Sequence, residues 1–456
     1  MGRKTALAIL IVSLCVLLSG CLPWSAEESY RLPRPPREYE NLMSAVAAAK
    51  RTLGTENATS VEEIAPSAGD STSTIQLLDM DGDDEQETAV TFFRVVGADN
   101  PVRICFFTQQ ADDSYELTSM IRGDGDNVYA VHYADLDGRT DEQTGKTTKE
   151  VVVSWQMGQN TYYLGVYSVD QAEGESLART AYDSYRLVDL DRDGRMELAV
   201  GRVDREQMTG SVDIYDWADG VEPTVGQVAL SAGISTIWQM RANYLTDFVP
   251  ALYVTGEVAD GAVAVDIITL RDGLPVNLTA DQQTGVSRER SGALRDLRVS
   301  DVNSDSILEV ARPWQLRGVG TNAGQWVSDW VQYNQRGRAR QSGTTYHNMA
   351  DGWYLIIPDS WRSRLVIYRN DSVSGQRAVI FALWQGEDKE PLPFLSIYKL
   401  TGASRSLRAT SGSRFILAED SSTTYAASFY NTWDCGLDES GLLENFRLVV
   451  NSWSGD

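Results

Sequence analysis

Apolar and polar residues alternate in short runs along most of the chain. Near its middle, Leu187 and Val188 lead into an acidic turn. After the turn, Met196, Leu198 and Val200 alternate with polar residues. A period of two on both sides of a turn predicts the order strand, turn, strand.

Similar runs recur over the neighbouring residues. Asp219–Gly220, Asp260–Gly261 and Asp272–Gly273 separate such runs, and Asp-Gly between alternating apolar residues predicts a β-hairpin. The 10–15-residue helical patterns of a parallel α/β sheet do not occur here. We expect strands buried on both faces, so the aromatic residues of this region should lie in the core, with sugar-binding platforms as the alternative. These residues are Trp155, Trp217 and Trp238.

The acidic turn belongs to a repeat. It recurs at steps of about 55 residues, which is room for about four strands. A copy that has lost most of its acids starts at Asp247, and an insertion, Arg139 to Thr148, interrupts the second copy. The candidate ligands of the other four copies are Asp79, Asp81, Asp83 and Glu87; Asp135, Asp137 and Glu150; Asp189, Asp191, Asp193 and Glu197; and Asp301, Asn303, Asp305 and Glu309.

Carboxylates this close together repel one another, and a hard cation with oxygen ligands removes that repulsion. Ca²⁺ prefers six to eight such oxygens, whereas Mg²⁺ keeps several waters. The last acid stands at position nine and precedes a strand, so the loop is not an EF-hand. The alternative is that Asp and Gly simply form turns between strands. Recurrence of the spacing favours calcium.

The string Leu187 to Gly201 resembles the FG-GAP/VCBS repeats of integrin-alpha-type β-propellers, over roughly residues 70 to 330. The chain departs from that family in lacking the Phe-Gly and Gly-Ala-Pro signatures, in having Glu at position nine and in showing five repeats where seven blades are usual. The resemblance implies a calcium-stabilised binding scaffold in a family that hosts adhesion modules and some enzymes.

The N-terminus predicts export. Arg3 and Lys4 precede an apolar run, Thr5 to Leu18, of signal-peptide length. The following Ser19-Gly20-Cys21 resembles the bacterial lipoprotein signal, which implies cleavage before Cys21 and lipid attachment to its sulfur. The alternative is an ordinary secretory signal. We therefore expect a signal peptide at 1–20, a Pro-rich tether at 21–38 and an extracytoplasmic protein anchored to a bacterial cell membrane.

Two folded regions are expected beyond the tether. Residues 39–345 should form a mainly β, propeller-like repeat domain that begins with a helix over Asn41 to Leu53. Residues 346–456 should form a small α+β domain with an antiparallel sheet. Its terminal helix is predicted over Glu439 to Asn451, with Asp438 as its cap. Arg336, Arg338 and Arg340 between the two regions are expected in a solvated hairpin or linker.

Composition restricts the function. A formal net charge of −24 argues against nucleic acid and against electrostatic binding to anionic lipid. Cys105 should be a buried thiol, although a disulfide with Cys435 is open. His132 and His347 are the only histidines, each in a polar context, and we expect one or both of them at the protein surface. The chain has no nucleophile elbow, zinc-spaced His/Cys set, P-loop or dinucleotide fingerprint.

Two functions follow from these features. The first is a non-catalytic binding or scaffold protein that presents its surface to an envelope protein or glycan. The alternative is a propeller-based surface hydrolase acting on polysaccharide or peptide, and acids outside the repeat loops would favour it.

Overall fold

The computed structural model describes residues 37–55, 60–123, 125–140, 147–170, 172–217, 222–318 and 323–449. The predicted signal peptide, Cys21 and nearly all of the tether lie outside these residues. No helix in the described ranges has the length and apolar character needed to cross a membrane.

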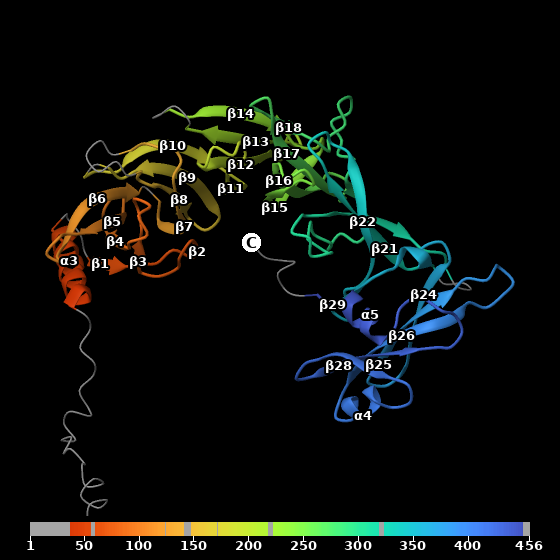
Figure 1. The fold of residues 1–456 in the computed structure, drawn as a ribbon. Helices are drawn as coiled ribbons and strands as arrows, with labels where there is room; N and C mark the ends of the chain where they lie inside the picture. Colours follow the sequence, from red (N-terminus) through yellow and green to blue (C-terminus); the bar gives the residue numbers. More distant parts are fainter. Residues whose placement is uncertain are drawn as a thin grey trace, which may run out of the picture.

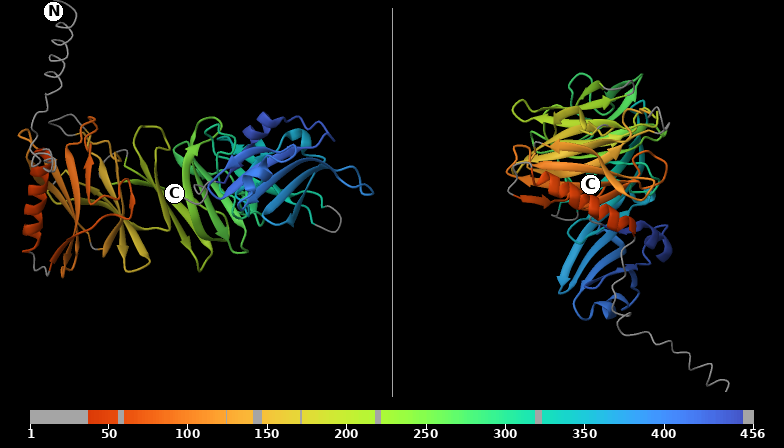
Figure 2. Two further views of the ribbon diagram at one scale, coloured as in Figure 1. Left: turned by 90° about the horizontal axis from the view of Figure 1, so that it is seen from below. Right: turned by 90° about the vertical axis from the view of Figure 1, so that its left-hand side faces the viewer.

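The chain is mainly β, with antiparallel sheets that succeed one another along an arc (Figure 1). None of the sheets closes on itself. Viewed from below, they follow in a row from α3 to the C-terminal sheet (Figure 2). We number them in chain order.

The first four sheets each contain a meander of three or four antiparallel strands. Sheet 1 holds β1 (Ser60–Glu63), β3 (Ile75–Leu78), β4 (Thr88–Val96), β5 (Val102–Gln109) and β6 (Tyr115–Gly123). Sheet 2 holds β7 (Asn127–Ala134), β8 (Glu150–Met157), β9 (Thr161–Ser168) and β10 (Glu175–Ala181), with β2 (Ala68–Gly69) added in parallel to β7. Sheet 3 holds β11 (Ser184–Val188), β12 (Glu197–Asp204), β13 (Thr209–Asp216) and β14 (Thr224–Ala229). Sheet 4 holds β15 (Ile234–Tyr244), β16 (Pro250–Val258), β17 (Val263–Arg271), β18 (Leu274–Asn277) and β19 (Arg290–Ser291).

Helix α3 (Arg37–Leu53) closes the outer face of sheet 1. It begins four residues before the predicted start, and its buried stripe consists of Leu42, Val46, Ala49 and Leu53. This stripe packs on Phe93, Cys105 and Phe107 of sheet 1. The predicted burial of Cys105 is confirmed. Cys105 and Cys435 are reduced thiols in different cores, so they do not form the disulfide that was left open.

Neighbouring sheets pack face to face, which explains why the second and third strands of each sheet are buried on both sides. Trp155 joins the core between sheets 1 and 2, and Trp217 joins the core between sheets 2 and 3, as predicted. The prediction for Trp238 is wrong: this residue of β15 lines a cavity on the concave side.

The fifth sheet joins the arc to the C-terminal region. It holds β20 (Val310–Gln315), β21 (Trp326–Tyr333), β22 (Ala339–Asn348), β23 (Trp353–Ile356) and β29 (Phe446–Leu448). The domain boundary expected between residues 345 and 346 therefore falls inside β22. Tyr346 and Trp353 of sheet 5 share one hydrophobic core with Phe381 of sheet 6, so the two sheets are packed as one unit.

Sheet 6 is antiparallel and carries short helical turns. It holds β24 (Leu365–Val373), β25 (Gln376–Leu383), β26 (Leu392–Thr401), β27 (Phe415–Glu419) and β28 (Thr423–Phe429), accompanied by the 3₁₀ turn η1 (Asp359–Trp361), α4 (Arg405–Ala409) and α5 (Glu439–Asn445).

The predicted terminal helix is too long. Asp438 caps α5 through the Gly441 N–H as expected (2.8 Å), but the helix ends at Asn445. Phe446 to Leu448 then pair with β23. An apolar spacing that suits a helix also suits a short edge strand, and pairing with β23 satisfies the backbone there.

Candidate functional site

The four acid-rich loops share one closing contact. In each loop the last glutamate accepts a hydrogen bond from the backbone N–H of the residue that follows the first aspartate. The pairs are Glu87 with Met80 (3.1 Å), Glu150 with Leu136 (2.8 Å), Glu197 with Leu190 (2.5 Å) and Glu309 with Val302 (2.8 Å). The loops lie between β3 and β4, β7 and β8, β11 and β12, and directly before β20.

The first aspartate of each loop organises the turn. In the third loop, Asp189 Oδ1 accepts from the Arg192 N–H (2.6 Å), and the chain takes a left-handed conformation at Arg192 and Gly194. The acids of each copy thereby turn inward: one ligand atom from each lies within 4.8 Å of the others, in all four loops. The predicted second group, Asp135, Asp137 and Glu150, thus comes together across its insertion.

The copy at Asp247 has a different role. Its carboxylate accepts from the Gln335 N–H, and Phe248 beside it is left-handed and exposed. No acid cluster forms at Asp247 among the described residues. The loss of its acids in sequence is thus matched by the loss of a candidate metal site.

Three of the four last glutamates are buried, which is unusual for carboxylates. Glu150, Glu197 and Glu309 are 2%, 3% and 0% exposed. Burial, and secondarily the neighbouring acids, raises the pKa of Glu150 and of Glu197 to about 8 and that of Glu309 to about 7. A bound divalent cation would offset this cost.

The loops differ in how far the protein itself neutralises them. Arg139 pairs with Asp137 (2.9 Å) and Arg195 pairs with Asp193. The Gln332 amide donates to both Asp305 and Glu309 (2.7 Å each) in the loop before β20.

One buried acceptor is left over in the first loop: Glu87 Oε2 accepts no hydrogen bond from any described residue. In the loop before β20, by contrast, the Asn303 amide is engaged with Asp305. The donor sets of the four loops consist of oxygen atoms and therefore fit Ca²⁺.

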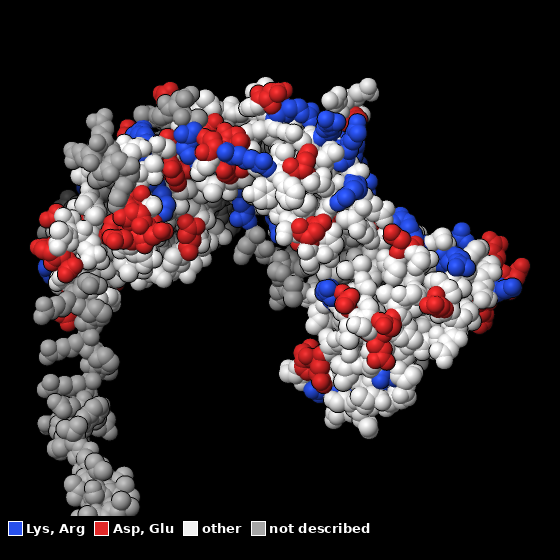
Figure 3. All heavy atoms as spheres, viewed as in Figure 1, with Lys and Arg blue, Asp and Glu red and all other residues white. Residues whose placement is uncertain are grey.

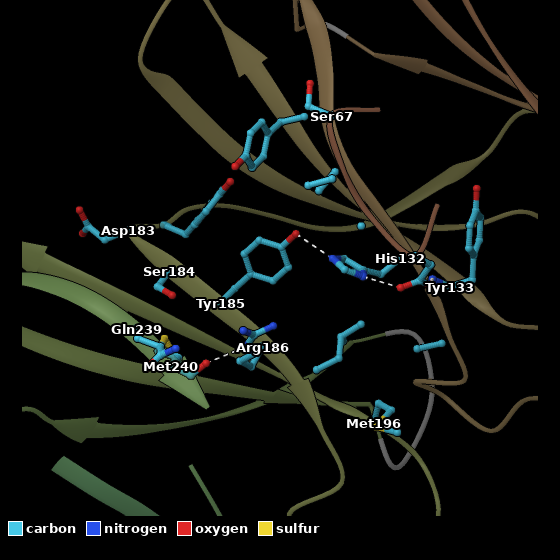
Figure 4. Close-up of a pocket in the computed structure, with 18 of the residues that line it drawn as sticks. Ser67, His132, Tyr133, Asp183, Ser184, Tyr185, Arg186, Met196, Gln239 and Met240 are labelled. Atoms are coloured by element: carbon cyan, nitrogen blue, oxygen red, sulfur yellow. Dashed lines mark hydrogen bonds and ion pairs between the residues drawn. The ribbon is translucent and has the colours of Figure 1, made fainter. Parts of the chain in front are cut away.

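A second feature, which the sequence analysis missed, is a cavity of about 990 Å³ on the concave side of the arc. We call it the inner trough. Its walls come from residues 67–70, from residues within 129–134, and from residues 182–187 and 238–240, together with Met196 and Arg298. β7, β11 and β15 thus contribute the first strands of three sheets (Figure 4).

His132 connects two walls of the inner trough. Its Nδ1 lies 2.7 Å from Asp70 Oδ1 and its Nε2 lies 3.1 Å from the Tyr185 hydroxyl (Figure 4). Because a carboxylate only accepts, Nδ1 donates to Asp70, and in the neutral imidazole Nε2 then accepts from the Tyr185 hydroxyl. Burial would raise the pKa of Asp70, but hydrogen bonds from His132 and the Tyr133 N–H lower it overall.

The expectation of a surface histidine is wrong for His347. His132 lines the inner trough and is partly exposed there. His347 is 6% exposed and stacks on Tyr354 with ring centroids 4.9 Å apart, and burial lowers the pKa of His347 to about 3.

The two acids of the inner trough are both engaged. Asp70 bonds His132, and Asp183 accepts from the Val203 N–H (2.7 Å) and from Arg205 (2.6 Å). Burial raises the pKa of Tyr133 and Tyr185, which keeps their hydroxyls protonated, and these hydroxyls bond Gln76 and His132 within the protein. The described lining therefore offers aromatic surface and arginine side chains, but no carboxylate pair open to a substrate.

One sequence signal could have indicated the inner trough. The segments just before the second and third acidic loops each carry two tyrosines, Tyr129 and Tyr133 in one and Tyr182 and Tyr185 in the other. Two tyrosines shortly before the acidic loop in each of two successive repeats mark the concave edge, although they do not stand at equivalent positions.

Comparison with known proteins gives no family. No family model matches the chain, and no curated protein matches its sequence. A protein from Bacteroides uniformis described as a 6-phosphogluconolactonase aligns over 63% of this chain and 80% of its own, with 11% identity and a TM-score of 0.28. The GH43 endo-arabinanase from Bacillus licheniformis aligns over 63% and 98%, with 13% identity and a TM-score of 0.23. Neither likeness defines the fold or the activity of this chain.

Proposed function

We propose that this protein is a non-catalytic binding protein of the bacterial envelope, anchored outside the cytoplasmic membrane by lipid on Cys21. Its successive sheets act as the blades of an open, propeller-like arc. Ca²⁺ in the acidic loops stabilises that arc, and the inner trough receives the ligand, a glycan or an envelope protein.

The inner trough is the observation that carries the proposal. A cavity of about 990 Å³ has the size of a ligand site, and its walls combine aromatic rings with a few convergent polar groups. Tyr129 at its rim is 39% exposed although it is a large aromatic residue. Exposed aromatic surface in a concave site supports recognition of a ligand.

The state of the acids favours binding over hydrolysis. A glycosidase needs a general acid and a second carboxylate that face the scissile bond. Asp70 and Asp183 are tied to partners within the protein, and the remaining clustered acids lie in the loops. Asp79, Asp189 and their loop partners would hold calcium, whose contribution is to neutralise charge and fix the turns.

The binding role can be tested with one matched pair of variants. Tyr129→Ala removes aromatic surface from the rim of the inner trough. Tyr244→Ala removes a 50% exposed tyrosine that does not line it. Purified protein is immobilised and its retention of solubilised envelope glycans and proteins is measured. We expect retention to fall at least tenfold for Tyr129→Ala only. Equal retention by both variants would reject the inner trough as the binding site.

The same protein should show no turnover of cell-wall glycans, peptides, phosphoesters or glycosides. Turnover that disappears on mutating Asp70 or Asp183 would instead establish the hydrolase. For the anchor, Cys21→Ser should release the protein from the membrane fraction, and mass spectrometry should find lipid on Cys21 of the parent chain. A soluble parent chain with an unmodified Cys21 would contradict the anchor.

A further inference from the structure

One end of the inner trough carries positive charge in a strongly acidic protein. Arg186 reaches from β11 toward β15, where its Nε donates to the Met240 carbonyl oxygen (2.6 Å; Figure 4). Arg298 lines the same cavity, and its Nη1 donates to the Arg295 carbonyl oxygen (2.7 Å). The chain as a whole has a formal net charge of −24, so a basic wall is a local exception.

These arginines are not neutralised by the protein. Within the described part of the chain, neither Arg186 nor Arg298 takes part in an ion pair. The acids in the lining do not act as counterions for these arginines, because Asp70 bonds His132 and Asp183 bonds Arg205. Each guanidinium has five N–H donors and uses one of its nitrogens here, which leaves donors for a ligand.

A third arginine adds to the positive potential. Arg241 donates to the Val299 carbonyl oxygen (2.7 Å), next to Arg298. Burial, followed by repulsion from Arg186, lowers the pKa of Arg241. Like charges held together without a counterion destabilise the unliganded protein, and an anion between them would relieve that cost.

The same wall carries flat aromatic surface. Trp238 lies under the Arg298 guanidinium, 4.8 Å from its carbon to the ring centroid, and both residues line the inner trough. The rings of Tyr133, Tyr182 and Tyr185 also line the cavity, while their hydroxyls are bonded within the protein. Indole and phenol rings suit the faces of sugar rings, and guanidiniums suit carboxylate or phosphate oxygens.

We propose that the inner trough binds an anionic oligosaccharide, with its carboxylate or phosphate groups on Arg186 and Arg298 and a sugar ring beside Trp238. This rests on the proposed binding function and names its ligand class. Glycans with uronic acids and glycans with phosphodiesters share this chemistry, so the two sources are compared directly.

The test is titration calorimetry of the full-length mature protein with tetragalacturonic acid, with neutral galactotetraose and with a glycerol phosphate oligomer. We expect at least one of the two anionic probes to bind, the neutral probe to bind at least tenfold more weakly, and affinity to fall with added salt. Arg298→Gln and Arg186→Gln should each reduce anion affinity at least tenfold. Arg338→Gln has the same charge change on an exposed arginine outside the cavity and should bind as the parent does.

Folding is controlled separately. Arg186 also donates to the Met240 carbonyl oxygen, so its removal could affect folding. Melting curves are therefore measured for Arg186→Gln and for Arg186→Lys. If Arg186→Gln does not fold, the affinity of Arg298→Gln for the anionic probes decides the test. Equal affinity for neutral and anionic probes, or full affinity in the folded arginine variants, would overturn the ligand class. If no probe binds while Tyr129→Ala still lowers retention of envelope material, the ligand class is wrong and the binding function stands. If no probe binds and Tyr129→Ala does not lower retention of envelope material, both the ligand class and the binding function are wrong.

Discussion

The Glu150 carboxylate accepts a hydrogen bond from the backbone N–H of Leu136 at 2.8 Å, although 14 positions separate the two residues. In the uninterrupted third loop, Glu197 makes the same contact with Leu190 over seven positions. The insertion in the second loop therefore leaves the closing contact intact. Glu150 also begins β8, so the contact fixes where the strand leaves the loop.

This contact predicts a stability loss that does not depend on metal. Glu150→Ala removes a buried acceptor and leaves the N–H groups of Leu136 and Asp137 without it. Urea unfolding in chelator should show a loss of about 1–3 kcal/mol in the free energy of unfolding. Glu175→Ala, at an exposed position in β10, is the control and should change it by less than about 0.5 kcal/mol. A Glu150→Ala protein as stable as the control would contradict the structural role.

Calcium binding predicts a stability that depends on the ion. The double variant Asp189→Ala, Asp193→Ala removes two acids of the third loop. At a hundredfold excess over Kd, one site stabilises by about 2.7 kcal/mol, so calcium should raise the Tm of the variant less than that of the parent. In chelator the two proteins should melt closer together.

The control for this experiment is a turn without a metal cluster. Asp204 caps the turn between β12 and β13 through the Glu206 and Gln207 N–H groups. Asp204→Ala should lower Tm equally with calcium and with chelator, because only the turn is lost. If the parent itself melts identically in both buffers, the loops are acidic turns and nothing more.

Gly69 predicts a steric effect at the edge of the inner trough. It lies in β2 at φ 101°, and a Cβ there would stand 2.2 Å from the Val131 carbonyl oxygen of β7. Gly69→Ala should separate β2 from β7 and cost about 3 kcal/mol or more. Gly158 has φ 65° and open space around it, so Gly158→Ala tests conformational strain alone, at about 1 kcal/mol. Equal losses by chemical denaturation would show that the close approach to Val131 is unimportant.

His347 predicts a loss of stability in acid. Burial lowers its pKa in the folded state to about 3, below the unfolded value of about 6.5. The unfolded chain therefore binds the proton more readily, and the stability is present above pH 6.5 and lost as pH falls toward 3. The slope from this group is about 1.4 kcal/mol per pH unit. His347→Gln should remove that slope between pH 6 and pH 4, measured by urea unfolding at each pH. A parent and variant with the same pH profile would refute it.

Features that close over short stretches of chain could be predicted from the amino-acid sequence alone. Alternation predicted the strands, and the spacing of Asp189, Asp191, Asp193 and Glu197 predicted that these side chains meet, as they do. The physical reason is local: a turn of nine residues is closed by its own backbone N–H groups and needs no distant partner. Calcium on these loops and lipid on Cys21 stay predictions.

Features that combine distant segments could not be predicted and are seen only in the folded chain. The inner trough needs residues 67–70, β7, β11 and β15 to share one concave face, and no local pattern specifies which faces meet. Trp238 was expected in the core because it is aromatic, but it lies on β15 and lines the inner trough instead. His347 was expected at the surface because its neighbours are polar, yet Trp330 and Tyr354 cover it. The burial of a side chain depends on how the sheets pack against each other. Residue type and local alternation therefore indicate which residues can be buried, but not which of them are.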